Sequence, residues 1–155
     1  MTDTMPRARL VSIAQRTDHA RDDVRRIDIA RVALVDRPIE GLEGAPGAAR
    51  AIIDRPGHIV VDASTPGTQL LILTERFHDG WRVSEGDRSV PAIRVYGNYL
   101  GCVVVPGVHR IVFTFAPNSL RDGLRLMWLG LALTAGAIVV LWRLPAQVRG
   151  VRLEG

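Results

Sequence analysis

The stretch LMWLGLALTAGAIVVLW, residues Leu126–Trp142, is a run of seventeen residues without a charge, closed by Arg125 and Arg143. As an α-helix it would be roughly 25 Å long, and short extensions bring it close to a bilayer core of about 30 Å. A buried helix of a soluble core is the alternative, but such helices carry a polar stripe and this run offers only Thr134. The run therefore predicts one transmembrane helix over residues 124–144.

The composition of this helix predicts its surroundings. Trp128 and Trp142 lie near its two ends, where amphipathic indole rings favour the membrane interface. Small residues inside the run would permit close approach of a second helix; they are Gly130, Ala132, Thr134, Ala135, Gly136 and Ala137. We expect membrane lipid and other transmembrane helices as partners. The alternative is that small residues are simply common in membrane helices.

Arginines on either side of the run predict its orientation. Residues 143–155 hold three arginines, whereas the upstream flank holds Arg121 and Arg125 close to Asp122. Cytoplasmic flanks carry the excess of basic residues. The bias is small, but it predicts a cytoplasmic basic tail over residues 145–155 and an extracytoplasmic body.

The net charge of +4 comes mainly from this flank. Residues 1–120 hold 15 arginines against 14 acidic residues, and residues 121–155 hold 5 against 2. A nucleic-acid-binding domain concentrates its basic residues on the domain itself, so we expect no nucleic acid as partner. All basic residues other than histidine are arginine, which we attribute to coding bias in a GC-rich genome.

From Pro56 onward, runs rich in valine and isoleucine alternate with Pro/Gly turns every eight to twelve residues, a rhythm typical of all-β folds. We therefore expect a mainly β fold, an antiparallel β-sandwich whose core spans residues 51–120. A few residues then lead into the helix, so the sandwich should lie at the membrane surface. The predicted strands are His58–Ser64, Gln69–Arg76, Trp81–Glu85, Ala92–Tyr96, Leu100–Val105 and Val108–Phe115.

Residues 1–50 are expected to pack on this sandwich. The pattern predicts a strand at Arg9–Ile13, a short surface helix at Arg21–Ala30, an extended segment at Arg31–Val35 and a loop at Pro38–Ala49. The first residues contain no apolar segment typical of a signal peptide. Two explanations remain open: the chain is the C-terminal part of a larger polytopic protein, or it is tail-anchored with a cytoplasmic body.

The order of these motifs resembles the C-terminal end of bacterial YfhO-type membrane proteins. The resemblance rests on RPGHIVVDASTPGTQLLILTERFHDGWRV (residues 55–83), then Asn98, then VVVPGVHRIVFTFAP (residues 103–117) and a membrane helix. The upstream segment RRIDIARVALVDRPIEG is also similar, so the likeness covers residues 7–143. Asp79 stands where the family usually has proline before its Gly-Trp pair, and Glu85-Gly86-Asp87 replaces an Asp-Gly turn; both keep turn chemistry.

The resemblance implies a bacterial cell-membrane protein concerned with glycosylation of cell-envelope glycans or glycolipids. The family is similar to multi-span glycosyltransferases, whose catalytic residues would lie in helices upstream of the similar segment. The resemblance therefore implies that this chain is the non-catalytic β-sandwich and last helix of such a protein. The alternative function is a self-standing, tail-anchored protein-binding module.

One group of residues fits a carbohydrate site. Glu75, His78 and Asp79 could bind hydroxyl groups beside the indole of Trp81, and Tyr96 and Tyr99 could add a stacking ledge. The same residues also fit a structural corner, with Trp81 buried against Leu71 or Leu73 and Phe113, and the sequence favours this structural role. The scattered histidines and the lone Cys102, expected in the core, lack metal-ligand spacing. We expect no catalytic residues, metal or cofactor.

Overall fold

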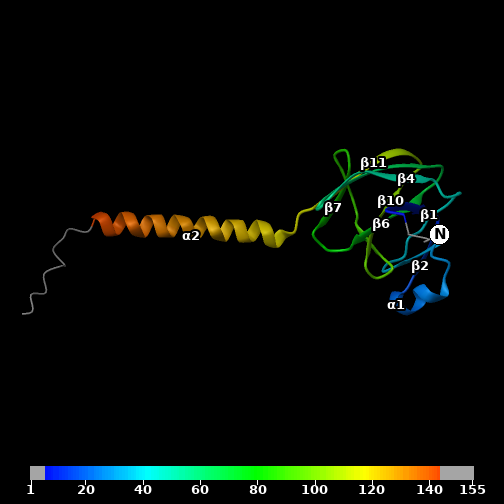
Figure 1. Cartoon of the computed structure of the whole chain (residues 1–155), viewed down its shortest axis with the longest axis horizontal. Helices are drawn as coiled ribbons and strands as arrows, with labels where there is room; N and C mark the ends of the chain where they lie inside the picture. The colour runs from blue at the N-terminus through cyan, green and yellow to red at the C-terminus, as the bar shows by residue number, and fades with distance from the viewer. Residues whose placement is uncertain (1–5, 144–155) are drawn as a thin grey trace, which may run out of the picture. The chain divides into compact units, whose positions relative to one another are not determined.

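The computed structural model describes residues 6–143 and divides at Ala116 and Pro117 into two compact units, a β-rich unit and a helical unit (Figure 1). The predicted basic tail over residues 145–155 lies outside the described residues.

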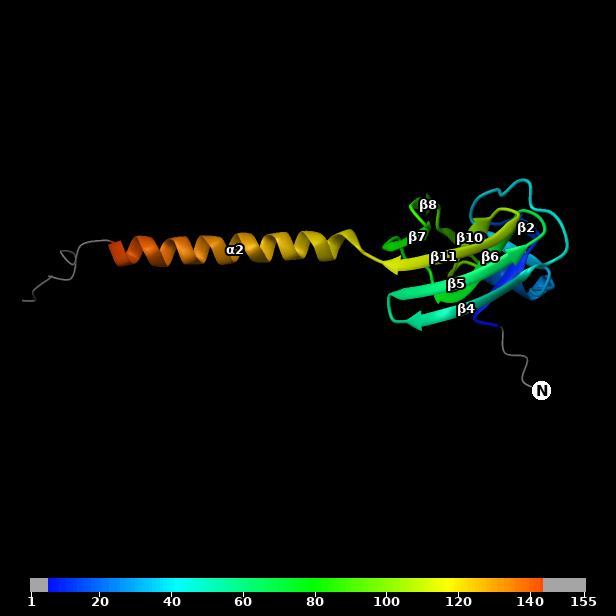
Figure 2. The same cartoon turned by 90° about the horizontal axis from the view of Figure 1, so that it is seen from above.

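Two packed sheets form the first unit, so the mainly β sandwich is confirmed. The first sheet contains, in spatial order, β1 (Ala8–Val11), β6 (Gln69–Arg76), β10 (Tyr99–Val104), β9 (Ile93–Val95), β3 (Val32–Val35) and β2 (Ile13–Arg16). The second contains β4 (Ala48–Arg55), β5 (His58–Thr65), β11 (Gly107–Phe115), β7 (Trp81–Glu85) and β8 (Arg88–Val90), and Figure 2 shows β4, β5 and β11 side by side. The pairs are antiparallel except β2 with β3, which is parallel.

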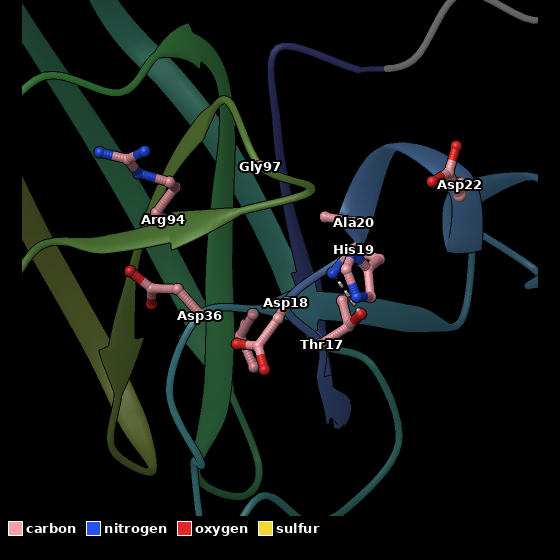
Figure 3. A pocket seen from close by; sticks show the side chains of 9 residues that line it. Thr17, Asp18, His19, Ala20, Asp22, Asp36, Arg94 and Gly97 are labelled. Carbon is pink, nitrogen blue, oxygen red and sulfur yellow. Dashed lines mark hydrogen bonds between the residues drawn. The ribbon is translucent and has the colours of Figure 1, made fainter.

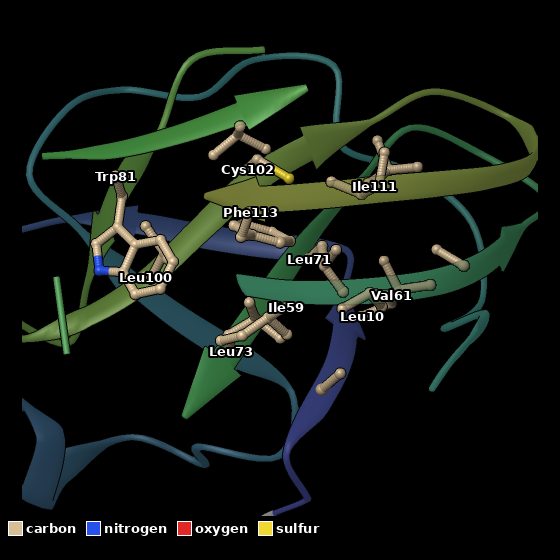
Figure 4. Packing of buried hydrophobic residues seen from close by; sticks show 14 residues of the cluster. Leu10, Ile59, Val61, Leu71, Leu73, Trp81, Leu100, Cys102, Ile111 and Phe113 are labelled. Atoms are coloured by element: carbon tan, nitrogen blue, oxygen red, sulfur yellow. The ribbon is translucent and has the colours of Figure 1, made fainter. Parts of the chain in front are cut away.

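The main core lies between the two sheets and follows from strand alternation, since successive side chains point to opposite faces. Leu71 and Leu73 of β6 meet Ile111 and Phe113 of β11 there, and all four are almost fully buried (Figure 4). Trp81, 7% exposed, belongs to the same cluster, which confirms its predicted burial. Cys102 is also buried there, as expected.

A second apolar cluster covers the other face of the first sheet. Leu70 and Ile72 of β6 pack there with Val11 and with Leu34 of β3. Partly buried residues of the β2–β3 connection and of the loop after β3 complete this cover; they are Ala20, Val24, Ile27, Ile39 and Leu42. The N-terminal region therefore contributes β1, β2 and β3 to the first sheet and also shields its outer face.

The prediction of a helix over Arg21–Ala30 is wrong in its length. The chain forms a single helical turn, α1 (Ala20–Asp23), followed by a short 3₁₀ turn, Val24–Arg26, and Ile27 is already extended. Asp28 explains the early end, because its Oδ1 accepts the N–H of Ala30 at 3.0 Å. This local bond competes with helical pairing and turns the chain toward β3.

Most predicted strands are found within one or two residues of their expected ends. The first strand is shorter than expected: it ends at Val11, and Ile13 begins β2. The predicted loop Pro38–Ala49 ends early, since β4 begins at Ala48, and β4 and β8 were not predicted as strands. Both are edge strands with mostly exposed side chains, so their hydrophobic signal is weak.

Two turns at one end of the sandwich depend on residues with positive φ. Pro56-Gly57 connects β4 to β5 with Gly57 at φ +74°, as a type II turn requires. After β9, Tyr96 and Gly97 have φ values of +50° and +74°, and the N–H of Asn98 donates to the carbonyl of Val95. A left-handed tyrosine is strained, so side-chain contacts must hold Tyr96 in place.

The second unit is the helix α2 (Asn118–Arg143). Its segment Gly123–Trp142 is long and apolar enough to cross a membrane, and none of it is buried, unlike a soluble core helix. The hydroxyl of Thr134 donates to the carbonyl of Gly130 at 2.9 Å, which satisfies the one polar side chain of the run. Residues 6–143 therefore contain one candidate membrane span.

Truncation of the buried indole tests the sandwich core. Trp81→Ala should lower the free energy of unfolding by about 3–5 kcal/mol, because it removes a large side chain that the core cannot refill. Denaturant unfolding of the full chain in neutral detergent, followed by near-ultraviolet circular dichroism, measures the change. Trp81→Phe is the control and should lose much less. An unchanged unfolding midpoint for Trp81→Ala would contradict the packing described.

Candidate functional site

A cleft of about 670 Å³ opens at the end of the sandwich where β6 and β11 finish and β5 and β7 begin. We call it the corner cleft. Its lining comes from five regions of the chain that sheet pairing brings together: Pro56, Gly57, Glu75, Arg76, Phe77, His78, Trp81, Arg94, Gly97, Asn98 and Phe115. Three of the residues singled out from sequence, Glu75, His78 and Trp81, are among them.

Hydrogen bonds within the β6–β7 turn set the shape of the cleft. The N–H of Trp81 donates to the carbonyl of His78 at 3.0 Å, and its indole Nε1 donates to the carbonyl of Arg76 at 3.1 Å. The N–H of Gly80 donates to Nδ1 of His78 at 2.9 Å. Nδ1 is thus an acceptor, so the neutral ring carries its proton on Nε2.

Aromatic rings form one wall of the cleft. The ring of Phe115 lies 5.3 Å from the rings of both His78 and Trp81, with tilted or edge-on geometry. Such arrangements stabilise aromatic pairs by about 0.5–1.5 kcal/mol. Trp81 faces the core, whereas Phe115 is 40% exposed. The apolar surface that the cleft offers to a ligand therefore comes from Phe115 rather than from Trp81.

Two arginines supply the positive charge of the cleft. The guanidinium of Arg94 lies 4.6 Å from the centre of the Phe77 ring, a cation–π contact. Arg76 is exposed at the end of β6. Among residues 6–143, neither side chain forms an ion pair. Sequence reasoning missed both. Arg94 reaches the cleft only through the pairing of β9 with β10, whereas Arg76 follows Glu75 directly and could have been found from its position in the sequence.

Glu75 already has a charged partner. Nη2 of Arg7 donates to Glu75 Oε2 at 2.6 Å and to Asp54 Oδ1 at 2.7 Å, and Nη1 donates to the carbonyl of Thr74. The hydrogen bond from Arg7 lowers the pKa of Asp54. Arg7 thus fastens the start of β1 to both sheets, and Glu75 serves this contact as well as lining the cleft.

The two tyrosines occupy different environments. The hydroxyl of Tyr96 is buried, accepts from Arg9 Nη2 at 2.7 Å and lies 2.7 Å from the carbonyl of Val32, to which it donates. Burial raises the pKa of Tyr96. Tyr99 is half-buried, with its ring edge-on to Tyr96 at 6.3 Å. The hydrogen bonds of Tyr96 hold the strained turn after β9 against β3, which gives this residue a structural role.

The last of the predicted residues, Asp79, is exposed at the tip of the β6–β7 turn. It lines a separate hollow of about 300 Å³ beside Trp81 and Arg82, not the corner cleft. Sequence proximity to Glu75 therefore does not place the two carboxylates in one cleft. Carbohydrate binding by the residues singled out from the sequence stays a prediction.

A further hollow of about 420 Å³ lies beside α1, where Asp18, Asp22 and Asp36 border it (Figure 3). The Arg94 guanidinium points away from these carboxylates in Figure 3. Among residues 6–143, no group of three His, Cys, Asp or Glu side chains is arranged to hold a metal ion. Burial raises the pKa of the Cys102 thiol far above its ordinary value, so this cysteine is an unreactive core residue.

Comparison of the chain with protein-family models, curated proteins and solved structures finds no match.

An ionisable pair lies away from the cleft, between β7 and β11. Nδ1 of His109 is hydrogen-bonded to the carboxylate of Glu85, and Nε2 lies 3.2 Å from the carbonyl of Pro106. Only the protonated ring can donate to both acceptors. Burial opposes the charge, but these hydrogen bonds outweigh it and raise the pKa of His109 above 6.5. The His109 side chain is 13% exposed.

Removal of one hydroxyl tests the structural role of Tyr96. Tyr96→Phe should destabilise the sandwich by about 1–3 kcal/mol, because the carbonyl of Val32 and the side chain of Arg9 lose a hydrogen-bond partner in a partly buried position. Tyr99→Phe is the matched control and should change stability by less than about 0.5 kcal/mol. Denaturant unfolding of both variants measures the difference. Equal effects would contradict the assignment.

The His109–Glu85 pair should make stability depend on pH. When folding raises the pKa of a group, protonation of that group stabilises the folded state. The full contribution is present at pH values below the pKa of the unfolded chain, and it is lost as pH rises through the pKa of the folded state. The free energy of unfolding should therefore decline as pH rises above 6.5. Glu85→Gln should flatten this decline. Unfolding titrations of both proteins from about pH 5 to about pH 9 measure it, and identical slopes would disprove the coupling.

Proposed function

We propose that the chain is the non-catalytic, extracytoplasmic β-sandwich and last membrane helix of a YfhO-type bacterial membrane protein that acts in glycosylation of cell-envelope glycans or glycolipids. The observation that carries the proposal is the direct connection of a complete sandwich to a membrane-competent helix: only Ala116 and Pro117 separate β11 from α2. Such a linker ties the sandwich to the membrane surface.

The family part of the proposal rests on the sequence motifs, and each motif corresponds to a defined part of the fold. The strand before the β6–β7 turn, the turn at Asp79-Gly80 with Trp81 after it, the Asn98 turn and the strand from Gly107 into α2 occur in the order of the motifs quoted from sequence. Each has a structural explanation in the fold. Trp81 fills the core behind the turn, and Asn98 accepts the N–H of Phe77 at 2.7 Å through its carbonyl.

The positions and partners of Glu75 and Asp79 support the proposal that the sandwich is not catalytic. Acid–base hydrolysis of glycosides uses two carboxyl groups facing one substrate. The corner cleft contains Glu75, which is ion-paired with Arg7, while Asp79 borders a different hollow. In the proposed protein, other helices would supply catalysis, and small residues on α2, such as Gly130 and Gly136, would pack against them.

Membrane insertion of α2 is the first test. The chain should sediment with bacterial membranes and resist extraction by alkaline carbonate. Leu133→Arg, at the middle of Gly123–Trp142, should release a large fraction, because a central arginine costs about 2.5–3.5 kcal/mol of insertion free energy. Leu124→Arg is the matched control near the helix end, where the side chain can reach the interface. Full recovery of the unsubstituted chain in the soluble fraction would refute the proposal.

Cysteine labelling separates the proposal from a tail-anchored module. In a Cys102→Ala background, Ser89→Cys places a thiol on the exposed strand β8 and Gln147→Cys places one in the tail. The changes are made at the chromosomal locus, so that the native context is kept. Labelling of position 89 alone by an impermeant maleimide in intact cells is the expected result. Labelling of position 147 alone would favour the cytoplasmic, tail-anchored alternative.

A further inference from the structure

The corner cleft combines positive charge with hydrogen-bond donors on residues that line it. Arg76 and Arg94 are exposed, and within residues 6–143 neither guanidinium has an ion-pair partner. The cation–π contact with Phe77 holds the Arg94 guanidinium near the Phe77 ring. His78 adds a third donor, because the hydrogen bond from Gly80 to Nδ1 leaves the Nε2 proton for a ligand. The acidic residue of the cleft, Glu75, is engaged by Arg7.

Three donors of this kind match a phosphate group. Arginine presents paired N–H groups in a rigid fork that fits phosphate oxygens, and charge-assisted bonds of this type are about twice as strong as neutral ones. A cleft of about 670 Å³ is much larger than one phosphate ion. The exposed ring of Phe115 and the ring of Pro56 form apolar surface beside the donors. The lining therefore suits a phosphate ester that carries carbon groups.

The chain itself limits how far this cleft can lie from a membrane that holds α2. Phe115 lines the cleft and ends β11, α2 begins at Asn118, and its apolar segment begins at Gly123. Three extended steps and five helical steps limit the distance between the Cα atoms of Phe115 and Gly123 to about 18 Å. Lipid headgroups occupy the first several ångströms outside the hydrocarbon core.

We propose that the corner cleft binds the phosphate headgroup of an anionic glycerophospholipid from the leaflet that α2 enters, with Arg76, Arg94 and His78 as donors and Phe115 against the glycerol and upper acyl carbons. This inference rests on the proposed membrane insertion of α2. Anionic headgroups are favoured over zwitterionic ones, because a choline cation would lie among two guanidinium groups. Bound lipid would hold the sandwich in a fixed orientation on the membrane surface.

The test uses the full chain in neutral detergent micelles and measures binding by nuclear magnetic resonance of the arginine Nε–H groups. Dioctanoyl phosphatidylglycerol is the probe, and dioctanoyl phosphatidylcholine and glycerol phosphate are the comparison ligands. We expect phosphatidylglycerol to shift the Nε–H signals of Arg76 and Arg94 with an affinity at least about tenfold above that of either comparison ligand, the equivalent of one good charge-assisted bond.

Paired variants make the test specific to the cleft. Arg76→Gln with Arg94→Gln should weaken phosphatidylglycerol binding about tenfold or more. Arg50→Gln with Arg88→Gln removes the same charge from exposed positions outside the cleft and should leave binding unchanged. Thermal unfolding midpoints verify that both double variants are folded. If the first does not fold, the lipid selectivity of the unsubstituted chain still decides.

Three results would overturn the proposal. Equal affinity for phosphatidylglycerol and phosphatidylcholine would exclude recognition of the anionic headgroup. Equal weakening by the two double variants would show general charge attraction rather than a site. Binding of glycerol phosphate as tightly as the lipid would assign the cleft to a soluble phosphate ester. Because binding is measured in micelles, its failure is separable from a failure of carbonate resistance in cells.

Discussion

The fold depends on the need to cover β6 on both faces. Residues Gln69–Leu73 are all buried, so neither side of the strand can face water. The second sheet covers Leu71 and Leu73, and the β2–β3 region covers Leu70 and Ile72. Leaving one of these leucine or isoleucine side chains exposed would reduce the free energy of unfolding by about 1.5–3 kcal/mol. Gln69 also connects the loop before β4 to this strand. Its side-chain Oε1 accepts the N–H of Gly47, and its Nε2 donates to the carbonyl of Ala45.

Sequence reasoning works for the sandwich where hydrophobic periodicity is strong. The strands from His58 to Phe115 carry apolar residues at regular spacing between Pro/Gly turns, and the structure places most of them within one or two residues. Prediction fails where the deciding interaction is a single polar contact or a sheet edge. Asp28 ends the N-terminal helix through one side-chain bond, and β4 is a strand because β5 offers it an edge.

The corner cleft shows a similar division. The turn residues His78 and Trp81 are close in sequence to Glu75, so their clustering could be predicted. Arg94 and the Arg7–Glu75 pair could not, because β9 and β1 are brought there by sheet pairing, and Arg7 lies 68 residues before Glu75. Asp79, at the tip of the β6–β7 turn, borders the neighbouring hollow instead. Local sequence thus predicted a polar corner, and sheet topology added Arg94 and the contact of Arg7 with Glu75.

The placement of β11 has a mechanical consequence. It lies inside the second sheet, pairs with β5 along Gly107–Thr114 and pairs with β7 along Ile111–Phe115, and two residues separate its end from Asn118, where α2 begins. Any tension that enters the sandwich from the helix is therefore applied to a strand bonded on both sides. Pulled along its length, such a strand loads its hydrogen bonds in parallel, so they must break together. The edge strand β8 is bonded to β7 alone, so it would hold the same tether through one ladder of hydrogen bonds, whereas β11 holds it through two.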